Sequence, residues 1–180
     1  MELRWAGPED AALVEEALLG IVNADPDRPA VSAERLRSEP TLSRYRVDFS
    51  VDGSVPAAGR PRRHGRDEPA RRRPFGIVAE VDGHPVGLVW AVFFPADAPG
   101  FGFVSAQAPE VQLWVREEFR RRGTGRTLLG SMVLDARARR LPGLSLSVDA
   151  FHPAVGLFFE AGFRTVGAGG HSETMLLALR

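Results

Sequence analysis

Hydrophobic residues in the first part of the 180-residue chain recur at the spacing of a helix. The segment 8–22 places its apolar residues on one side, at Val14, Ala17, Leu18, Ile21 and Val22. Proline at its first position, followed by two acidic residues, is typical of a helix start. A short strand over 3–6 precedes this helix, and a weaker helical pattern covers 33–42.

From residue 75 onward the pattern alternates between strands and helices. Strands over 75–81 and 85–94 flank Asp82-Gly83-His84, whose Asp-Gly pair is typical of a hairpin turn. The second strand is apolar on both faces, which predicts a central place in a sheet. The sequence further predicts strands over 110–115, 144–148, 163–167 and 173–179, and helices over 123–140 and 153–160. This order predicts a mixed α/β sheet.

The composition is that of a single folded domain spanning residues 1–180. Hydrophobic residues make up 44% and charged residues 26%, which is enough to build a core. Lys+Arg and Asp+Glu are both 23, and this zero net charge argues against a whole surface built to bind nucleic acid or membranes. The absence of cysteine excludes disulfides, thiolate zinc sites and a cysteine nucleophile. The four histidines share no ligand spacing, so we expect no metal site.

Residues 50–74 form an Arg/Pro-rich insertion within this domain. The insertion contains four prolines, several glycines and seven arginines, and it has almost nothing to bury. Two interpretations are open: a flexible, solvated insertion, or a basic clamp for a phosphate-bearing ligand or nucleic acid. Runs of like charge usually remain solvated, so the first interpretation is favoured.

The segment from Val115 to Arg126 gives the most direct indication of the chemistry of this protein. A strand ends there, a basic loop with Gly123 and Gly125 follows, and a long helix begins. Glycines let a ligand approach the backbone, and the first amides of a helix, which have no acceptors within it, bind phosphate groups. The other interpretation is a basic loop that caps an amphipathic helix. A P-loop is excluded because the chain has no lysine, and Leu128 replaces the third glycine of a Rossmann motif.

The same segment resembles the acyl-coenzyme A signature of the GNAT superfamily of N-acetyltransferases. That signature is Arg or Gln, two residues, Gly, one residue, then Gly or Ala, and here it reads Arg120-x-x-Gly123-x-Gly125. The later half of that superfamily commonly carries Asn-Pro-Ala, Leu-Tyr and Gly-Phe. Leu146-Ser-Val148, His152-Pro-Ala, Leu157-Phe158 and Gly162-Phe163 resemble this half, with His152 in place of the asparagine. The resemblance extends over 75–179 and 3–22 and leaves out the insertion.

This resemblance implies a strongly twisted mixed sheet flanked by helices, with a splay between the two central parallel strands, 110–115 and 144–148. It implies acetyl-CoA as the acyl donor and no metal. The pantetheine arm of acetyl-CoA would enter the splay, and its pyrophosphate would lie at the helix start. The residues implied for coenzyme binding are Leu113, Trp114, Val115, Arg120, Arg121, Arg122, Gly123, Thr124, Gly125, Arg126 and Phe158.

The resemblance also implies transfer of the acetyl group to a primary amine of a small molecule or peptide, by direct attack on the thioester. An alkylammonium has a pKa of about 10, so a base must remove a proton, directly or through water. Glu110, at the start of the central strand, is the expected base. The other interpretation is an exposed strand-end carboxylate, and Glu80 is a weaker candidate for the base. A backbone amide of Leu113 or Val115 is expected to hold the oxyanion.

The usual general acid of the superfamily, a tyrosine, aligns with Phe158, which cannot donate a proton. His152 is the alternative acid, because histidine titrates near neutrality, or else it makes a structural hydrogen bond at the helix start. The missing tyrosine leaves a second function open, in which a degenerate domain binds acyl-CoA as a sensor or partner without turnover. The sole tyrosine, Tyr45, lies far upstream in a poorly matched region.

We expect a cytoplasmic enzyme. The N-terminus lacks the basic and apolar stretches of a signal peptide, and the longest apolar run, about 87–94, is too short to cross a bilayer. The expected partner is the amine acceptor, which the sequence does not identify. Nucleic acid and membranes are not expected partners, and a homodimer remains open because dimers are common in the superfamily.

Overall fold

The computed structural model describes residues 1–49 and 72–179. The predicted insertion over 50–74 falls outside the described residues except for its last three positions. The elements in chain order are β1 (Glu2–Trp5), η1 (Pro8–Asp10), α1 (Ala11–Val22), α2 (Ala33–Ser38), α3 (Pro40–Ser43), β2 (Phe75–Val81), β3 (His84–Val92), β4 (Glu110–Val115), η3 (Glu117–Phe119), α4 (Thr124–Ala138), β5 (Gly143–Asp149), α5 (Val155–Glu160), β6 (Arg164–Gly169) and β7 (Ser172–Ala178).

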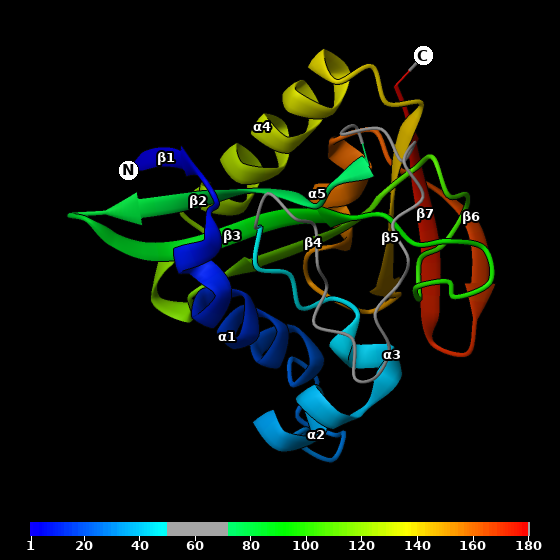
Figure 1. Ribbon diagram of the computed structural model, residues 1–180, viewed down its shortest axis with the longest axis horizontal. Helices are drawn as coiled ribbons and strands as arrows, with labels where there is room; N and C mark the ends of the chain where they lie inside the picture. The colour runs from blue at the N-terminus through cyan, green and yellow to red at the C-terminus, as the bar shows by residue number, and fades with distance from the viewer. Residues whose placement is uncertain (50–71, 180) are drawn as a thin grey trace, which may run out of the picture.

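A seven-stranded sheet organises the chain, with the strands in the order β1-β2-β3-β4-β5-β7-β6 (Figure 1). Neighbouring strands run antiparallel except β4 and β5, which are parallel. Helices cover both faces, with α4 and α5 on one side and α1, α2 and α3 on the other (Figure 1). The predicted mixed α/β sheet flanked by helices is confirmed.

Each face of the sheet has its own hydrophobic core. Leu128 and Met132 of α4 pack against strand residues on one face. Val14 and Leu18 of α1 pack on the other face, around the fully buried Trp90. Successive side chains of a strand point to opposite faces, so a central strand such as β4 contributes to both cores.

Two element boundaries differ from the sequence predictions, each for a reason of backbone chemistry. The helical pattern over 33–42 splits at Glu39, which is extended with a ψ of 119° because the following Pro40 disfavours the helical region. His84 belongs to β3 rather than to the turn. Asp82 and Gly83 close the hairpin by themselves, with φ angles of 52° and 75°.

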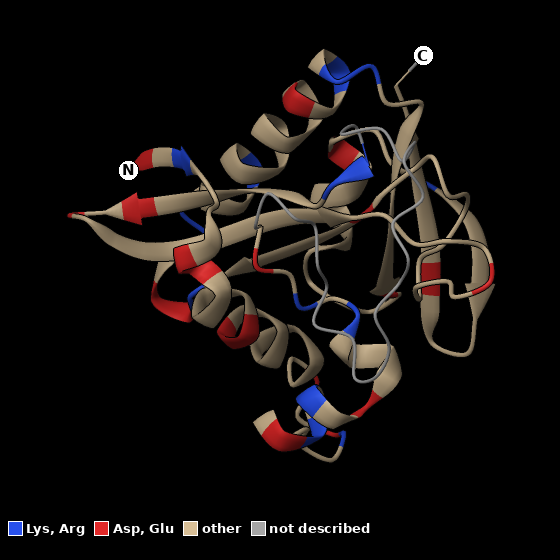
Figure 2. Cartoon of the chain, viewed as in Figure 1, with Lys and Arg blue, Asp and Glu red and all other residues tan. Residues whose placement is uncertain are grey.

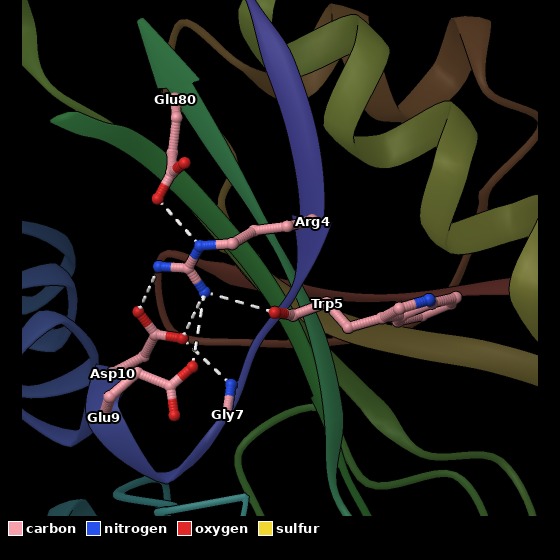
Figure 3. Close-up of polar contacts among 6 residues, drawn as sticks. All are labelled: Arg4, Trp5, Gly7, Glu9, Asp10 and Glu80. Atoms are coloured by element: carbon pink, nitrogen blue, oxygen red, sulfur yellow. Dashed lines mark hydrogen bonds and ion pairs between the residues drawn. The ribbon is translucent and has the colours of Figure 1, made fainter. Parts of the chain in front are cut away.

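An ion-pair cluster around Arg4 fastens β1 and β2 to the start of the first helix (Figure 3). The guanidinium donates to both carboxylate oxygens of Asp10 and to Oε1 of Glu80, each at 2.7 Å. Asp10 is 4% exposed and also accepts from the Gly7 amide at 2.9 Å. Burial acts to raise the pKa of Asp10, but these donors outweigh burial and hold the pKa below its usual value. Glu80, the weaker candidate base, is held in this cluster at the opposite end of β3 from Glu110.

Charged side chains are interspersed over the elements visible in Figure 2. Basic residues gather at the C-terminal end of α4, at Arg137, Arg139 and Arg140, where the helix dipole is negative (Figure 2).

Candidate active site

The parallel strands β4 and β5 meet at one point and then separate. Glu110 and Ser145 are register partners, and the Ser145 amide donates to the Pro109 carbonyl at 3.0 Å. On its other side β4 pairs with β3 along its whole length, from Glu110 to Val115. Beyond Glu110, therefore, β4 has a neighbouring strand on one side only, as the predicted splay requires.

The backbone of β4 presents hydrogen-bonding groups to the gap between these strands. The Arg116 amide donates to the Val86 carbonyl of β3 at 2.9 Å. Because successive amides of a strand point to opposite sides, those of Leu113 and Val115 face β5 instead. The Val115 carbonyl accepts from Nε of Arg120 at 3.0 Å, so this arginine lies at the open end of the gap. The expected role of these two amides, binding the pantetheine arm, stays a prediction.

Trp114 points away from the gap. Its backbone pairs with Leu88 of β3, and its indole packs so closely against α1 that a Cβ on Gly20 would collide with the indole nitrogen. The side chain is buried in the core between the sheet and α1. The structure therefore does not bring this predicted coenzyme residue into the gap.

The loop after β4 ends in a left-handed glycine that starts α4. Gly123 has a φ of 87°, a conformation that residues with side chains rarely adopt, and the space where a Cβ would stand is open. The Thr127 amide donates to the Gly123 carbonyl at 3.0 Å, which leaves the amides of residues 124–126 without acceptors in the helix. These amides, at the positive end of the helix dipole, form a site suited to a phosphate group.

The predicted basic residues surround this helix start and are exposed at positions 120, 121, 122 and 126. The guanidinium of Arg122 lies 5.6 Å from the centre of the Phe119 ring. Arg126 forms an ion pair with Glu160 of α5 at 2.5 Å, so a ligand that uses Arg126 competes with this carboxylate. Thr124 is buried and donates its hydroxyl to the Phe119 carbonyl at 3.3 Å, whereas the half-buried Gly125 faces α5.

His152 lies between β5 and α5. Its Nδ1 accepts from the Ala154 amide at 3.1 Å, which is the structural hydrogen bond that the sequence analysis left open. Burial and the positive charge of Arg120 both lower the pKa of His152. Phe158 is buried and packs edge-on against Phe163, with the ring centres 6.0 Å apart.

Glu110 is enclosed on the α1 side of β4 and is 2% exposed. Its Oε1 accepts from the Tyr45 hydroxyl at 2.7 Å and from the Gln112 side chain at 3.3 Å. Its Oε2 has no hydrogen-bond partner of normal geometry among the described residues. Burial raises the pKa of Glu110 to about 7, against the lowering effects of Tyr45, the Gly102 amide and Gln112. Such a carboxyl group exchanges protons near neutral pH, as a general base must.

The loop between β3 and β4 closes over this carboxyl group through two glycines. A Cβ on Gly100 would collide with Oε2 of Glu110 and crowd the Tyr45 hydroxyl. A Cβ on Gly102 would collide with the backbone of β5 at Leu146, just beyond the point where the two strands separate. Only glycine allows the loop to pass this close at both positions.

Ser145 adds a second buried polar atom at the same place. The residue is fully buried, and its hydroxyl has no hydrogen-bond partner among the described residues. Its neighbours Leu144 and Leu146 face the core under α4, so the Ser145 side chain lies on the other face of the sheet, as that of Glu110 does. Two polar atoms without partners therefore stand on adjacent strands where the gap begins.

Tyr45 is the site residue that the sequence analysis missed. It lies 65 positions before Glu110, and no pattern in the sequence connects the two. The available signal is that Tyr45 is the only tyrosine of the chain. Gly100 and Gly102 offer a similar signal, because two glycines flanking an aromatic residue indicate a close backbone approach.

The described part of the chain contains no group of His, Cys, Asp or Glu side chains arranged to hold a metal ion. Within residues 1–49 and 72–179, no helix is long and apolar enough to cross a membrane. The groups that make up the candidate site are a strand gap, a helix start and an enclosed carboxyl group.

Comparison with known proteins finds the same architecture elsewhere. A family model described as "Acetyltransferase (GNAT) family" matches residues 41–163, whereas no curated protein matches the chain. The yncA structure from Salmonella typhimurium with acetyl-CoA is 18% identical, covers 100% of this chain and 94% of its own, and superposes with a TM-score of 0.63. PaiA N-acetyltransferase from Thermoplasma acidophilum in complex with coenzyme A is 13% identical, covers 99% of both chains and has a TM-score of 0.65. The ribosomal-protein-alanine N-acetyltransferase from Brucella melitensis is 22% identical, covers 98% of this chain and 97% of its own, and has a TM-score of 0.59.

Proposed function

This chain belongs to the GNAT family of acetyltransferases, and from that premise we propose that it transfers the acetyl group of acetyl-CoA to a primary amine of a small molecule or peptide. Membership of this family establishes acetyl transfer as the reaction. The amine acceptor follows from the resemblance to N-acetyltransferases. We propose the roles of individual residues from the geometry of the site.

The helix start and the strand gap support binding of the donor. We expect the pyrophosphate to bind the amides at the start of α4, which Gly123 leaves open, with the exposed arginines as counter-charges. The pantetheine arm would pair with the amides of Leu113 and Val115, which face the gap. The presence of acetyl-CoA with yncA and of coenzyme A with PaiA, two proteins of similar fold, supports the same donor here.

In this proposal Glu110 is the general base. The amine nitrogen attacks the thioester carbonyl carbon, the new C–N bond forms, and the proton lost by nitrogen passes to the Glu110 carboxylate. A backbone amide of Leu113 or Val115 stabilises the oxyanion before the C–S bond breaks. Because the Gly100–Gly102 segment covers Oε2, transfer of the proton through a hydroxyl or a water molecule is favoured over direct contact with the amine.

Coenzyme A would leave as the thiolate. The pKa of a thiol is about 8.5, so a thiolate departs without the full protonation that an alkoxide needs. His152 remains the candidate acid, although burial and the charge of Arg120 lower its pKa and so weaken its tendency to carry a proton. Turnover in this proposal therefore does not depend on the tyrosine that Phe158 replaces.

A single observation carries the proposal. The Glu110 carboxyl group, which is 2% exposed, is enclosed at the point where β4 and β5 separate. There a base would lie between the donor site in the gap and an acceptor approaching from the α1 side of the sheet.

Calorimetry with acetyl-CoA, combined with thiol release over a panel of primary amines, tests the proposal. The chain suits this assay, because it has no cysteine to react with a thiol reagent and no lysine to accept acetyl groups. We expect binding of acetyl-CoA, and thiol release with at least one class of amine. Binding without thiol release across the panel favours the sensor, the second candidate function, which Phe158 supports. Failure to bind acetyl-CoA contradicts both functions.

Replacement of the base tests its role. Glu110→Gln should lower kcat by roughly 10²- to 10⁴-fold, because general base catalysis is lost, while the Kd for acetyl-CoA stays within about two-fold. Glu80→Gln is the matched control, because Glu80 is held by Arg4 at the other end of β3, and it should keep kcat near the wild-type value. Equal kcat values for the two variants would remove Glu110 from the mechanism.

A further inference from the structure

Tyr45 joins three segments of the chain around Glu110. Its hydroxyl donates to Oε1 of Glu110 at 2.7 Å and accepts from the Phe101 amide at 2.6 Å. Its backbone carbonyl accepts from the Trp90 indole at 3.2 Å. The segment after α3, the loop between β3 and β4, and β4 itself therefore meet at one side chain.

Aromatic packing fixes the position of the Tyr45 ring. Phe94 meets the ring edge-on with centres 4.9 Å apart, and Phe101 stacks on it at 5.8 Å with an interplanar angle of 6°. The residue is 3% exposed. A ring enclosed in this way has few rotamers available, so its hydroxyl stays in one place without further entropy cost.

Donor and acceptor chemistry then decides which oxygen of Glu110 is basic. The Phe101 amide can only donate, so the Tyr45 hydroxyl accepts from it and must direct its own proton to Oε1 of Glu110. The amide nitrogen of Gln112 also donates to Oε1. Oε1 thus receives two donors of normal geometry, whereas Oε2 has none in the described residues. The Gly102 amide also stabilises the carboxylate, but not through a hydrogen bond of normal geometry.

We propose that Tyr45 is a positioning residue for the acetyl transfer reaction: its hydroxyl holds Oε1 of Glu110 so that Oε2 is the oxygen that takes the proton. This inference rests on the proposed function of Glu110 as the base. It assigns to the chain's only tyrosine a role other than that of an acid for the leaving group.

The charges around the pair give the direction of its effect. In the described part of the chain, Arg44 is the further ionisable group that acts on the pair of Tyr45 and Glu110. The Arg44 guanidinium donates to the Pro99 carbonyl at 3.2 Å and lowers the pKa of Tyr45, whereas burial and the charge of Glu110 raise it. Tyr45 therefore stays protonated and is a donor throughout the range in which Glu110 titrates.

Removal of the hydroxyl should raise the pKa of Glu110, because the donor stabilises the carboxylate. The titration of Glu110 can be followed by the ¹³Cδ shift in protein labelled at glutamate, with the resonance assigned by its loss in Glu110→Gln. We expect a midpoint of about 7 in the wild type, and a midpoint about one pH unit higher in Tyr45→Phe. An unchanged or lower midpoint in Tyr45→Phe overturns the inference.

A second measurement avoids any loss of folding. Because the chain has one tyrosine, growth on 3-fluorotyrosine modifies Tyr45 alone. The fluorinated phenol is more acidic and a stronger donor, so the midpoint of Glu110 should move to lower pH, opposite to the shift in Tyr45→Phe. Shifts in the same direction for both proteins contradict the donor role.

Kinetics with the best amine of the panel separates this inference from the proposed function. In Tyr45→Phe, kcat at pH 7 should fall about five-fold and recover at higher pH, because a smaller fraction of Glu110 is ionised at neutrality. Phe75→Leu, a packing control in the core on the opposite face of the sheet, should keep the wild-type pH profile. If Glu110→Gln is as active as wild type, Glu110 is not the general base and the proposed function of this residue fails. The titration would still show whether Tyr45 donates a hydrogen bond to Glu110. If Glu110→Gln is inactive but Tyr45→Phe keeps the wild-type profile, the positioning role alone is wrong.

Discussion

At the scale of single residues, two buried carboxyl groups are perturbed in opposite directions. Burial raises the pKa of Glu110, whereas the donors from Arg4 and Gly7 hold the pKa of Asp10 below its usual value. A group that binds its proton more tightly in the folded state stabilises the fold at low pH, and one that binds it less tightly does so at higher pH. The free energy of unfolding should therefore fall in acid, where Asp10 becomes protonated, and also fall towards neutral pH, where Glu110 becomes ionised.

Glu110 should make the folded protein less stable as the pH rises towards neutrality. Its pKa of about 7 exceeds the ordinary value of 4.5, so the stabilisation is complete below pH 4.5 and is lost as the pH rises through 7. A shift of this size corresponds to about 3 kcal/mol. Urea unfolding between about pH 5.5 and pH 8 should show this fall for the wild type and not for Glu110→Gln, which has nothing to ionise. The same fall in both proteins would assign it to other groups.

Asp10 should contribute stability that disappears in acid. Its pKa is depressed, so the contribution is present above the ordinary carboxyl range and is lost as the pH falls through the depressed value. Asp10→Asn removes the charge that binds Arg4 and should lower the free energy of unfolding at pH 7 by about 2 kcal/mol, discounted because the Arg4 side chain is 34% exposed. Glu9→Gln is the control, because Glu9 is 69% exposed at 3.9 Å from the same guanidinium, and it should change stability by less than about 0.5 kcal/mol. Urea unfolding at pH 7 measures the free energy of unfolding of both variants. Equal losses would show that the specific hydrogen bonds between Asp10 and Arg4 contribute nothing beyond the removal of one negative charge.

At the scale of elements, the start of α4 combines a backbone requirement with a proposed ligand site. Gly123 adopts the left-handed region, whereas Gly130, in the exposed middle of the same helix, does not. Neither position has any atom within 4 Å of where a Cβ would stand. A substitution at Gly130 is therefore the control for one at Gly123. Both add a side chain, but only the one at Gly123 strains the backbone and occupies the proposed ligand site.

Gly123→Val should weaken the binding of acetyl-CoA by at least about ten-fold, because a side chain would occupy the open space in which we propose that the pyrophosphate binds. The substitution also strains the backbone, so the free energy of unfolding should fall by about 1–2 kcal/mol. Gly130→Ala should leave binding unchanged and raise stability by up to about 1 kcal/mol. Calorimetry measures both affinities, and an unchanged Kd in Gly123→Val would refute the placement of the coenzyme at this helix start.

The elements that the sequence predicts best are those with a single strong periodicity. The strand over 110–115 is confirmed residue for residue. The long helix predicted over 123–140 is found over Thr124–Ala138, with Gly123 as its N-cap. The prediction of a single helix over 33–42 is wrong. The apolar spacing does not reflect the effect of Pro40, which keeps Glu39 out of the helical conformation. Tyr45 and Glu110 could not be paired from the sequence, since their contact depends on how the segment after α3 crosses the sheet, and periodicity carries no information on that path.

At the scale of the whole molecule, the sheet brings the two halves of the site together from distant parts of the chain. The proposed donor site is built from β4, α4 and β5, whereas the enclosure of Glu110 is built from the segment after α3 and the loop between β3 and β4. The insertion over 50–74 connects that segment to β2. Val47 on one side of the insertion and Phe75 on the other are buried, so the described ends of the connection are part of the core.

The Arg/Pro-rich insertion should be dispensable for acetyl transfer. Deletion of residues 54–73 leaves Tyr45, Val47 and Phe75 in place, and loop length affects stability only weakly, so kcat and the KM for acetyl-CoA should stay within about two-fold of wild type. A second variant that keeps the length but replaces the seven arginines with glutamine isolates their charge. Thiol release with the best amine measures both proteins. A rise of ten-fold or more in the KM for acetyl-CoA, seen in both variants, would mean that the arginines bind the phosphates of the donor, because loss of length alone cannot explain a defect shared by a variant of full length.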